Sequence, residues 1–175
     1  KGNGTKNLLK GTSKNLNYRK YPDNCVSLGI IKNHVKADTK TKLIRKYAVT
    51  SASVHDSQLV GELLDATDQD QEFYADSAYT GKAAQEVYAE KKVVDMVNEK
   101  GYKNRPLTEA QKKSNREKSK VRARVEHIFG FVENSMNGSY IRTIGMARAK
   151  AKIGMMNIVY NICRCVQLKK VVSMG

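Results

Sequence analysis

Two acidic residues stand out because each lies in a sequence context that suits catalysis. Asp76 follows the apolar residues 73–75 and precedes a turn that contains Gly81. Glu126 lies in the strongly basic segment 120–130. Carboxylates can hold divalent metal ions that activate an oxygen nucleophile and stabilise the leaving oxygen when a phosphodiester is cut. Mg²⁺ prefers oxygen ligands and keeps several waters, so a few Asp and Glu residues suffice. The pair predicts a metal-dependent, nuclease-like site.

The elements around these acids would place both at the edge of a sheet. Residues 71–75 are expected to form a short buried strand, with Asp76 at its carboxyl end, where α/β sheets place functional side chains. A long helix is predicted from the N-cap Thr108 to about Val132. Glu126 is off the centre of the apolar stripe of this helix, which consists of Val121, Val125, Ile128, Phe129 and Val132. Taken singly, Asp76 also fits an ordinary strand-ending turn and Glu126 an ordinary surface ion pair.

The rest of the chain predicts an α/β fold. Residues 25–35 and 43–54 suggest an antiparallel hairpin, and residues 93–97 suggest another strand. Helical spacing follows Asp56 and again Gly81, so strands and helices alternate and part of the sheet should be parallel. Residues 146–168 are apolar on nearly all sides, which predicts a helix packed on several sides. Residues 1–24 are interpreted as a basic loop or arm, and 25–170 as one domain.

Charge points to a polyanionic partner. The chain has 175 residues with 32 Lys and Arg against 17 Asp and Glu, a net charge of +15. Clustered cations gain free energy by releasing the counterions condensed on nucleic acid.

A membrane span is not expected, because no run approaches the roughly 18 apolar residues that one needs. Phosphate-binding loops of the P-loop and Rossmann kinds are absent from the sequence, which argues against nucleotide-dependent catalysis. The cysteines, Cys25, Cys163 and Cys165, are expected to be buried thiols.

Several segments in order resemble DDE-type insertion-sequence transposases, most closely the insertion-sequence-five group. One is Tyr74-Ala-Asp-Ser-Ala-Tyr-Thr-Gly81, and another is Arg122-Ala-Arg-Val-Glu-His-Ile-Phe-Gly130. The other matching segments are 32–38, 42–57 and 157–161. Two positions depart from the pattern: Ser119 stands where related enzymes often have Tyr, and Glu133 where they often have Lys.

The resemblance implies a ribonuclease H-like fold, a mixed sheet with flanking helices, and a triad of two Asp and one Glu that binds Mg²⁺ or Mn²⁺. Asp76 would be the second Asp and Glu126 the final Glu, both acting as catalytic metal ligands. The first Asp of the family lies upstream of the hairpin, and no residue of 1–24 fits it. We therefore expect a partial catalytic domain that lacks its first strand. DNA contacts are expected from five basic residues of the long helix: Arg116, Lys118, Lys120, Arg122 and Arg124.

Two functions remain open at this point. The first is a transposase catalytic region that cleaves DNA and transfers strands with divalent metal, acting on element ends and target in double-stranded DNA. It would work as a homo-oligomer on DNA in the bacterial cytoplasm, associated with the nucleoid. The alternative is an inactive transposase remnant that only binds nucleic acid. Metal-dependent DNA cleavage separates the two.

Overall fold

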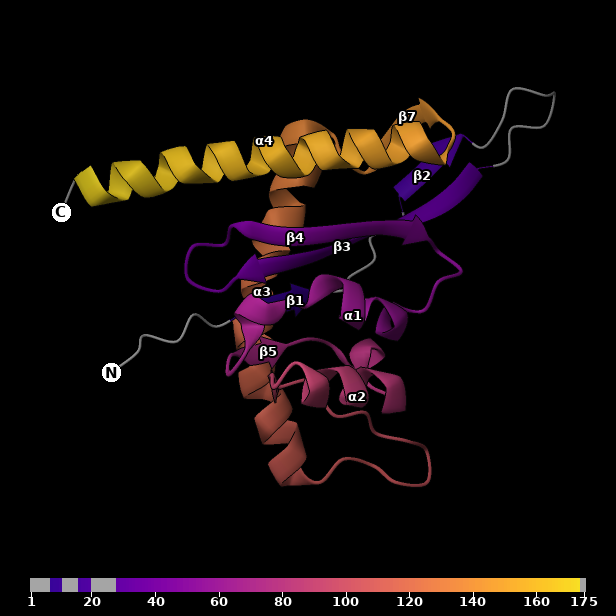
Figure 1. The fold of residues 1–175 in the computed structure, drawn as a ribbon, viewed down its shortest axis with the longest axis vertical. Helices are drawn as coiled ribbons and strands as arrows, with labels where there is room; N and C mark the ends of the chain where they lie inside the picture. The colour runs from indigo at the N-terminus through magenta and orange to yellow at the C-terminus, as the bar shows by residue number, and fades with distance from the viewer. Residues whose placement is uncertain (1–6, 11–15, 20–27, 174–175) are drawn as a thin grey trace.

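The computed structural model describes residues 7–10, 16–19 and 28–173, which form a mixed sheet with helices on both faces (Figure 1). The strands run β1 (Asn7–Lys10), β2 (Leu16–Arg19), β3 (Leu28–Asp38), β4 (Ile44–Ser51), β5 (Glu72–Tyr74), β6 (Val94–Asp95) and β7 (Tyr140–Ile144). The α-helices are α1 (Val60–Leu63), α2 (Lys82–Glu90), α3 (Glu109–Met136) and α4 (Met146–Ser173). Three short 3-10 helices complete the described part: η1 (Asp56–Leu59), η2 (Ala66–Asp68) and η3 (Ser77–Tyr79).

The long strand β3 organises the sheet. It pairs antiparallel with β4 along one edge, and with β1 and β2 in succession along the other. Strand β5 runs parallel to β1, and β6 runs parallel to β5, so the sheet has an antiparallel and a parallel part. The predicted hairpin and the predicted mixed α/β architecture are both confirmed, although residues 25–27 of the expected first hairpin strand lie outside the described residues.

The two faces of β3 have different chemistry because successive side chains point to opposite sides of a strand. Ile31, Val35 and Ala37 face α3 and α4 and join one apolar core cluster. Lys32, His34 and Lys36 point to the other face, where α1, α2 and the 3-10 helices lie. That face has its own apolar cluster, built from residues of these helices and of β5. Both layers contain buried polar groups: Asn33 of β3 bonds to Asn157 of α4 in the first layer, and the second layer contains His34 and Lys36.

The described part of residues 1–24 corrects two expectations. We expected a loop or arm there, but Asn7–Lys10 and Leu16–Arg19 are strands. We also expected the sheet to lack a strand ahead of the hairpin, but β1 lies between β3 and β5 and pairs with both. The residues of β1 read Asn-Leu-Leu-Lys, so this strand contains no carboxylate.

Helix α3 agrees closely with the prediction. The Thr108 hydroxyl accepts a hydrogen bond from the Gln111 backbone N–H, and the Gln111 side chain accepts one from the Thr108 backbone, which forms a capping box. The helix runs four residues beyond Val132 to Met136, and Asn137, with a left-handed backbone (φ 51°), forms the C-cap. Val125, Ile128, Phe129 and Val132 are buried, and Val121 is partly buried against them.

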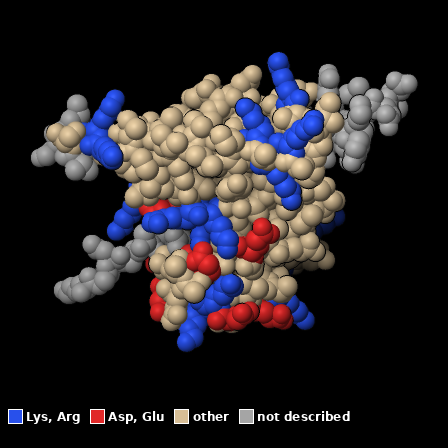
Figure 2. All heavy atoms as spheres, turned by 45° about the horizontal axis from the view of Figure 1, so that its top comes forward, with Lys and Arg blue, Asp and Glu red and all other residues tan. Residues whose placement is uncertain are grey.

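Helix α4 differs from the prediction, because one side alone is buried. Its buried residues fall at helical spacing: Ala149, Ile153, Met156, Asn157 and Tyr160. The opposite side is exposed and still apolar: Met155, Ile158, Val159, Ile162 and Val166. Figure 2 shows this surface as a broad tan band with basic side chains gathered at both of its ends.

Cys165 is exposed rather than buried, and Cys163 is half-buried. No helix of the described residues is apolar over a length that could cross a membrane.

Candidate active site

Asp76 lies directly after β5, at the end of a strand, where the sequence predicted it. Its Oδ1 accepts a hydrogen bond of 2.9 Å from the Ala78 backbone N–H, so the side chain caps η3. Its Oδ2 lies 3.7 Å from the Arg122 guanidinium of α3. The cap fixes one oxygen in place, and the second oxygen faces the helix. Asp76 is thus held at the sheet edge with its carboxylate toward α3.

Arg122 joins α3 to the turn that contains Asp76. The side chains of Arg122 and Asp76 are 15% and 26% exposed, so the pair is partly shielded from water. Charges in such a position interact more strongly than a fully exposed pair does. The Arg122 Nε is buried and has no hydrogen-bond partner in the described residues. Sequence reasoning predicted a DNA contact for Arg122 and did not predict its ion pair with Asp76.

Glu126 follows Arg122 by one helical turn, so the two residues share a side of α3. The buried neighbours Val125 and Ile128 fix how α3 is rotated against the sheet. This rotation leaves Glu126 exposed, on the wall of a cleft between α3 and α4. Arg122 therefore contacts Asp76 and shares a side of α3 with Glu126.

Asn98 is a polar residue of this region that we did not predict. Its backbone N–H donates to the Ala75 carbonyl at 3.1 Å, which places Asn98 beside Asp76 at the ends of neighbouring parallel strands. Its Nδ2 donates to the Ser119 hydroxyl of α3 at 3.1 Å. Its Oδ1 is buried and lacks a partner in the part of the chain that the structure describes. Its position immediately after the predicted strand 93–97 was the signal that could have revealed it.

Buried hydrogen bonds and ion pairs lie behind the turn that contains Asp76, between η3 and strand β3. The Tyr79 hydroxyl, at the end of η3, is hydrogen-bonded to the His34 Nδ1 at 3.0 Å. Burial raises the pKa of Tyr79 above its ordinary value, and the charges of Asp56 and Asp76 raise it further. Asp56 is itself held by a 2.8 Å ion pair with Lys32. The Tyr79–His34 hydrogen bond therefore anchors the turn to β3.

The five basic residues predicted to contact DNA divide between two sides of α3, because residues two apart lie about 200° apart around a helix. Lys118 and Arg122 face the sheet edge, where the Lys118 ammonium donates to the Val97 carbonyl at 3.0 Å. Arg116, Lys120 and Arg124 form the outer row and are exposed. Lys120 is paired with Glu117 at 2.8 Å. The outer row is thus the side of α3 available to a large anionic partner.

Comparison with known proteins identifies the family. Residues 9–162 match the family described as "Transposase DDE domain". The chain belongs to this family. This transposase domain is also similar to a protein of Neisseria meningitidis serogroup B described as "Transposase for insertion sequence element IS1106". The two are 27% identical over 133 residues, which cover 76% of this chain and 46% of the relative.

The transposase domain therefore spans about half the length of the curated relative that it matches. No solved structure matches it. The family match includes Asp76, Arg122 and Glu126, and it begins within β1, ahead of the hairpin. The recognised resemblance to DDE-type insertion-sequence transposases is confirmed, while the insertion-sequence-five group stays a prediction.

The expected metal site of the transposase domain is not complete in the described residues. They contain no group of three His, Cys, Asp or Glu side chains that could hold a metal ion. Strand β1 provides no carboxylate, and Asp76 is engaged by the Ala78 backbone and by Arg122. The described part of the chain thus offers Asp76 and Glu126, and a third carboxylate would have to come from outside it to complete the three-carboxylate site that the family implies.

Proposed function

We propose that this chain is the DNA-cleaving region of an insertion-sequence transposase, which cuts DNA at element ends and transfers the cut strands to target DNA. A ribonuclease H-like fold belongs to the proposal. The main support for the proposed DNA cleavage is the arrangement around Arg122, which contacts Asp76 and lies one turn from Glu126. Residues 9–162, which include all three, match the transposase domain. Arg122 thus contacts one acid and shares a side of α3 with the other, although the two acids are fifty positions apart in sequence (126 − 76 = 50).

The proposed roles follow from the chemistry of these groups. Asp76 and Glu126 are the two carboxylates that this chain supplies to the reacting site, and Arg122 holds the Asp76 carboxylate against α3. Mg²⁺ or Mn²⁺ would supply activation of the attacking oxygen and charge stabilisation in such a site. The outer row of Arg116, Lys120 and Arg124 would hold double-stranded DNA by its phosphates, which is a salt-dependent interaction. Assembly as a homo-oligomer on DNA in the bacterial cytoplasm completes the proposal.

The test is nicking of supercoiled plasmid by the 175-residue chain in the presence of Mg²⁺ or Mn²⁺. We expect metal-dependent nicking that falls by roughly 100-fold or more in Asp76→Asn and in Glu126→Gln, because each removes a group that acts in the reaction. Two control variants make the same chemical changes elsewhere. Asp70→Asn alters an exposed acid in a left-handed position that Asn also adopts, and Glu133→Gln alters an acid two turns further along α3. Nicking that persists in both site variants contradicts the proposal.

A second function, a nucleic-acid-binding module without catalysis, is favoured by one observation. Strand β1 lies in the sheet beside β5 but carries no carboxylate to place next to Asp76. Such a module would bind DNA equally well with Mg²⁺ or with EDTA, and Glu126→Gln would leave its affinity unchanged. A folded chain that binds plasmid in this way and never nicks it supports the binding module over the catalytic region.

A further inference from the structure

The turn between β3 and β4 is clamped by both long helices. From α4, the Arg164 Nε donates to the Thr41 carbonyl at 2.7 Å, and the Tyr160 hydroxyl donates to the Lys42 carbonyl at 2.9 Å. From α3, the Arg124 Nη1 donates to the Thr39 carbonyl at 3.4 Å. Three backbone carbonyls of one turn are thus held by side chains from two helices. The turn is a fixed part of the surface rather than a loose loop tip.

These contacts bring three cations together. Burial lowers the pKa of Lys42, and the nearby positive charges of Arg164 and Arg124, which repel its ammonium, lower this pKa further. The ion pairs formed within the described residues include none of the three. Lys42 also has a left-handed backbone, with φ 61°, which non-glycine residues seldom adopt. An uncompensated cluster of this kind gains free energy when an anion neutralises it.

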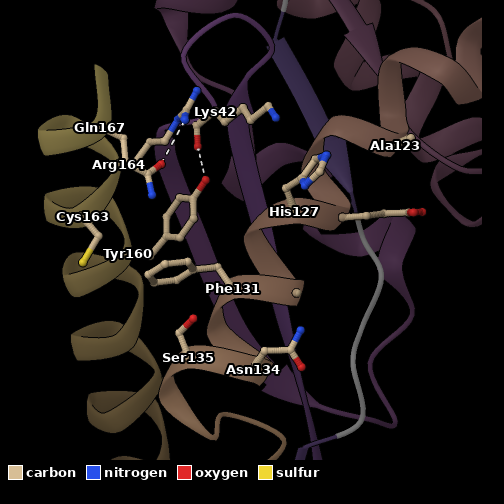
Figure 3. A pocket seen from close by; sticks show the side chains of 12 residues that line it. Lys42, Ala123, His127, Phe131, Asn134, Ser135, Tyr160, Cys163, Arg164 and Gln167 are labelled. Atoms are coloured by element: carbon tan, nitrogen blue, oxygen red, sulfur yellow. Dashed lines mark hydrogen bonds between the residues drawn. The ribbon is translucent and has the colours of Figure 1, made fainter. Parts of the chain in front are cut away.

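A cleft of about 660 Å³ opens beside the cluster, between α3 and α4. Figure 3 shows Lys42 and His127 extending into the space between the two helices, with Asn134 further along the same wall. Side chains with N–H or O–H groups line much of the cleft: Lys42, His127, Asn134, Ser135, Arg164 and Gln167. The volume falls within the roughly 300–1,000 Å³ of typical ligand sites. Glu126 lines the same cleft, so Lys42 and Arg164 share the cleft with an acid of the proposed active site.

The aromatic residues of the cleft do not favour base stacking. Phe131 and Tyr160 pack edge to face against each other, with ring centroids 5.6 Å apart. Tyr160 is 4% exposed and its hydroxyl is used on the Lys42 carbonyl. Base stacking needs an open aromatic face. The chemistry of the cleft is therefore suited to phosphate rather than to nucleobases.

We propose that this cleft binds the phosphodiester backbone of a nucleic-acid strand through Lys42 and Arg164, with the nearby Arg124 adding positive charge, and so holds the strand beside Glu126. The inference rests on the proposed function, since it names how DNA is held at that site. It adds a contact from the β3–β4 turn and α4, two elements outside the basic helix segment 116–124. Binding here uses charge and hydrogen bonds alone and needs no metal ion.

The test is the affinity of the 175-residue chain for a labelled single-stranded oligonucleotide, measured by fluorescence anisotropy in EDTA at several salt concentrations. The variant is Lys42→Gln, which removes the ammonium and leaves the backbone carbonyl that Tyr160 binds. The matched control is Lys92→Gln, because Lys92 is also a lysine with a left-handed backbone (φ 51°), and it follows α2 on the other face of the sheet. Circular dichroism confirms that both variants are folded.

We expect Lys42→Gln to weaken binding by roughly tenfold at low salt and to reduce the slope of log K against log salt by about 0.7, the value for one lost contact to a single strand. Lys92→Gln should match the wild type. Equal affinities of the two variants would overturn the cleft proposal while DNA binding, and with it the proposed function, still stands. A folded wild type that does not bind the oligonucleotide would overturn both. Inorganic phosphate that binds in calorimetry without competing with the oligonucleotide also counts against the cleft.

Discussion

Burial of His34 makes the stability of this protein depend on pH. His34 is 0% exposed, and its two ring nitrogens are hydrogen-bonded to the Tyr79 hydroxyl at 3.0 Å and the Thr50 hydroxyl at 3.1 Å. Burial lowers its pKa from 6.5 to about 4, with Asp56 opposing this shift and Lys32 adding to it. Between these two pKa values the unfolded chain binds a proton that the folded chain does not. The free energy of unfolding therefore falls as pH drops from 6.5 to 4.

The size of the effect follows from the shift. A change of about 2.5 pKa units (6.5 − 4) at 1.36 kcal/mol per unit amounts to about 3 kcal/mol over the whole window. About 2.5 kcal/mol of this should be lost between pH 7.0 and 4.5. That is a large part of the roughly 5–15 kcal/mol that stabilises a typical domain. The low pKa of Asp65, caused first by its bond to Lys36, contributes mainly below its ordinary value of 3.8 and so stays outside this window.

The assay is urea denaturation at pH 7.0 and 4.5, followed by circular dichroism, for the wild type, His34→Gln and His127→Gln. His34→Gln should be less stable at pH 7.0, because it disturbs buried hydrogen bonds, but should lose at least 2 kcal/mol less on acidification than the wild type does. His127 is exposed, so His127→Gln should keep the wild-type pH dependence. A wild type equally stable at both pH values, or a His34→Gln variant with unchanged pH dependence, would show that buried His34 does not control the stability in acid.

Two further predictions concern packing and buried charge. A Cβ at Gly138 would come within 2.7 Å of the Val132 carbonyl oxygen, so Gly138→Ala should lower the free energy of unfolding by about 1–3 kcal/mol. A Cβ at Gly130 meets nothing within 4 Å, so Gly130→Ala should stabilise α3 by up to about 1 kcal/mol. Thermal denaturation of the two variants distinguishes these opposite effects. The Lys36 ammonium is 2.8 Å from the buried Asp68 carboxylate. Lys36→Met should therefore lower the free energy of unfolding, measured by urea denaturation, by about 3–5 kcal/mol. A loss below about 1 kcal/mol would show that Asp68 does not need this partner.

Local patterns in the sequence were enough to predict the parts of the fold that depend on local signals. The apolar spacing of α3 and its N-cap Thr108 predicted both the helix and its orientation. Alternating and β-branched residues predicted the β3–β4 hairpin. The position of Asp76 after β5 followed from an apolar strand that ends in a turn. In each case the signal and the element lie in the same stretch of chain.

The failures concern features that depend on long-range contacts. Apolar residues around α4 predicted burial on several sides, but its sheet face alone is covered, because hydrophobicity does not show how many neighbours a helix has. The strands β1 and β2 have little pattern of their own and form by pairing with β3. The Asp76–Arg122 ion pair and the place of Asn98 beside Asp76 depend on how strands and α3 meet in space. Sequence spacing alone could not supply these contacts.

Plasmid nicking by a variant with both substitutions shows whether Asp76 and Glu126 act in one site. Residues that act as a unit in one reaction have effects that do not add. We predict that Asp76→Asn, Glu126→Gln and the variant with both changes have nearly the same residual metal-dependent nicking rate. Rates in which the second substitution multiplies the loss of the first would contradict a shared site. Undiminished nicking in the double variant would contradict any role of these two acids in cleavage.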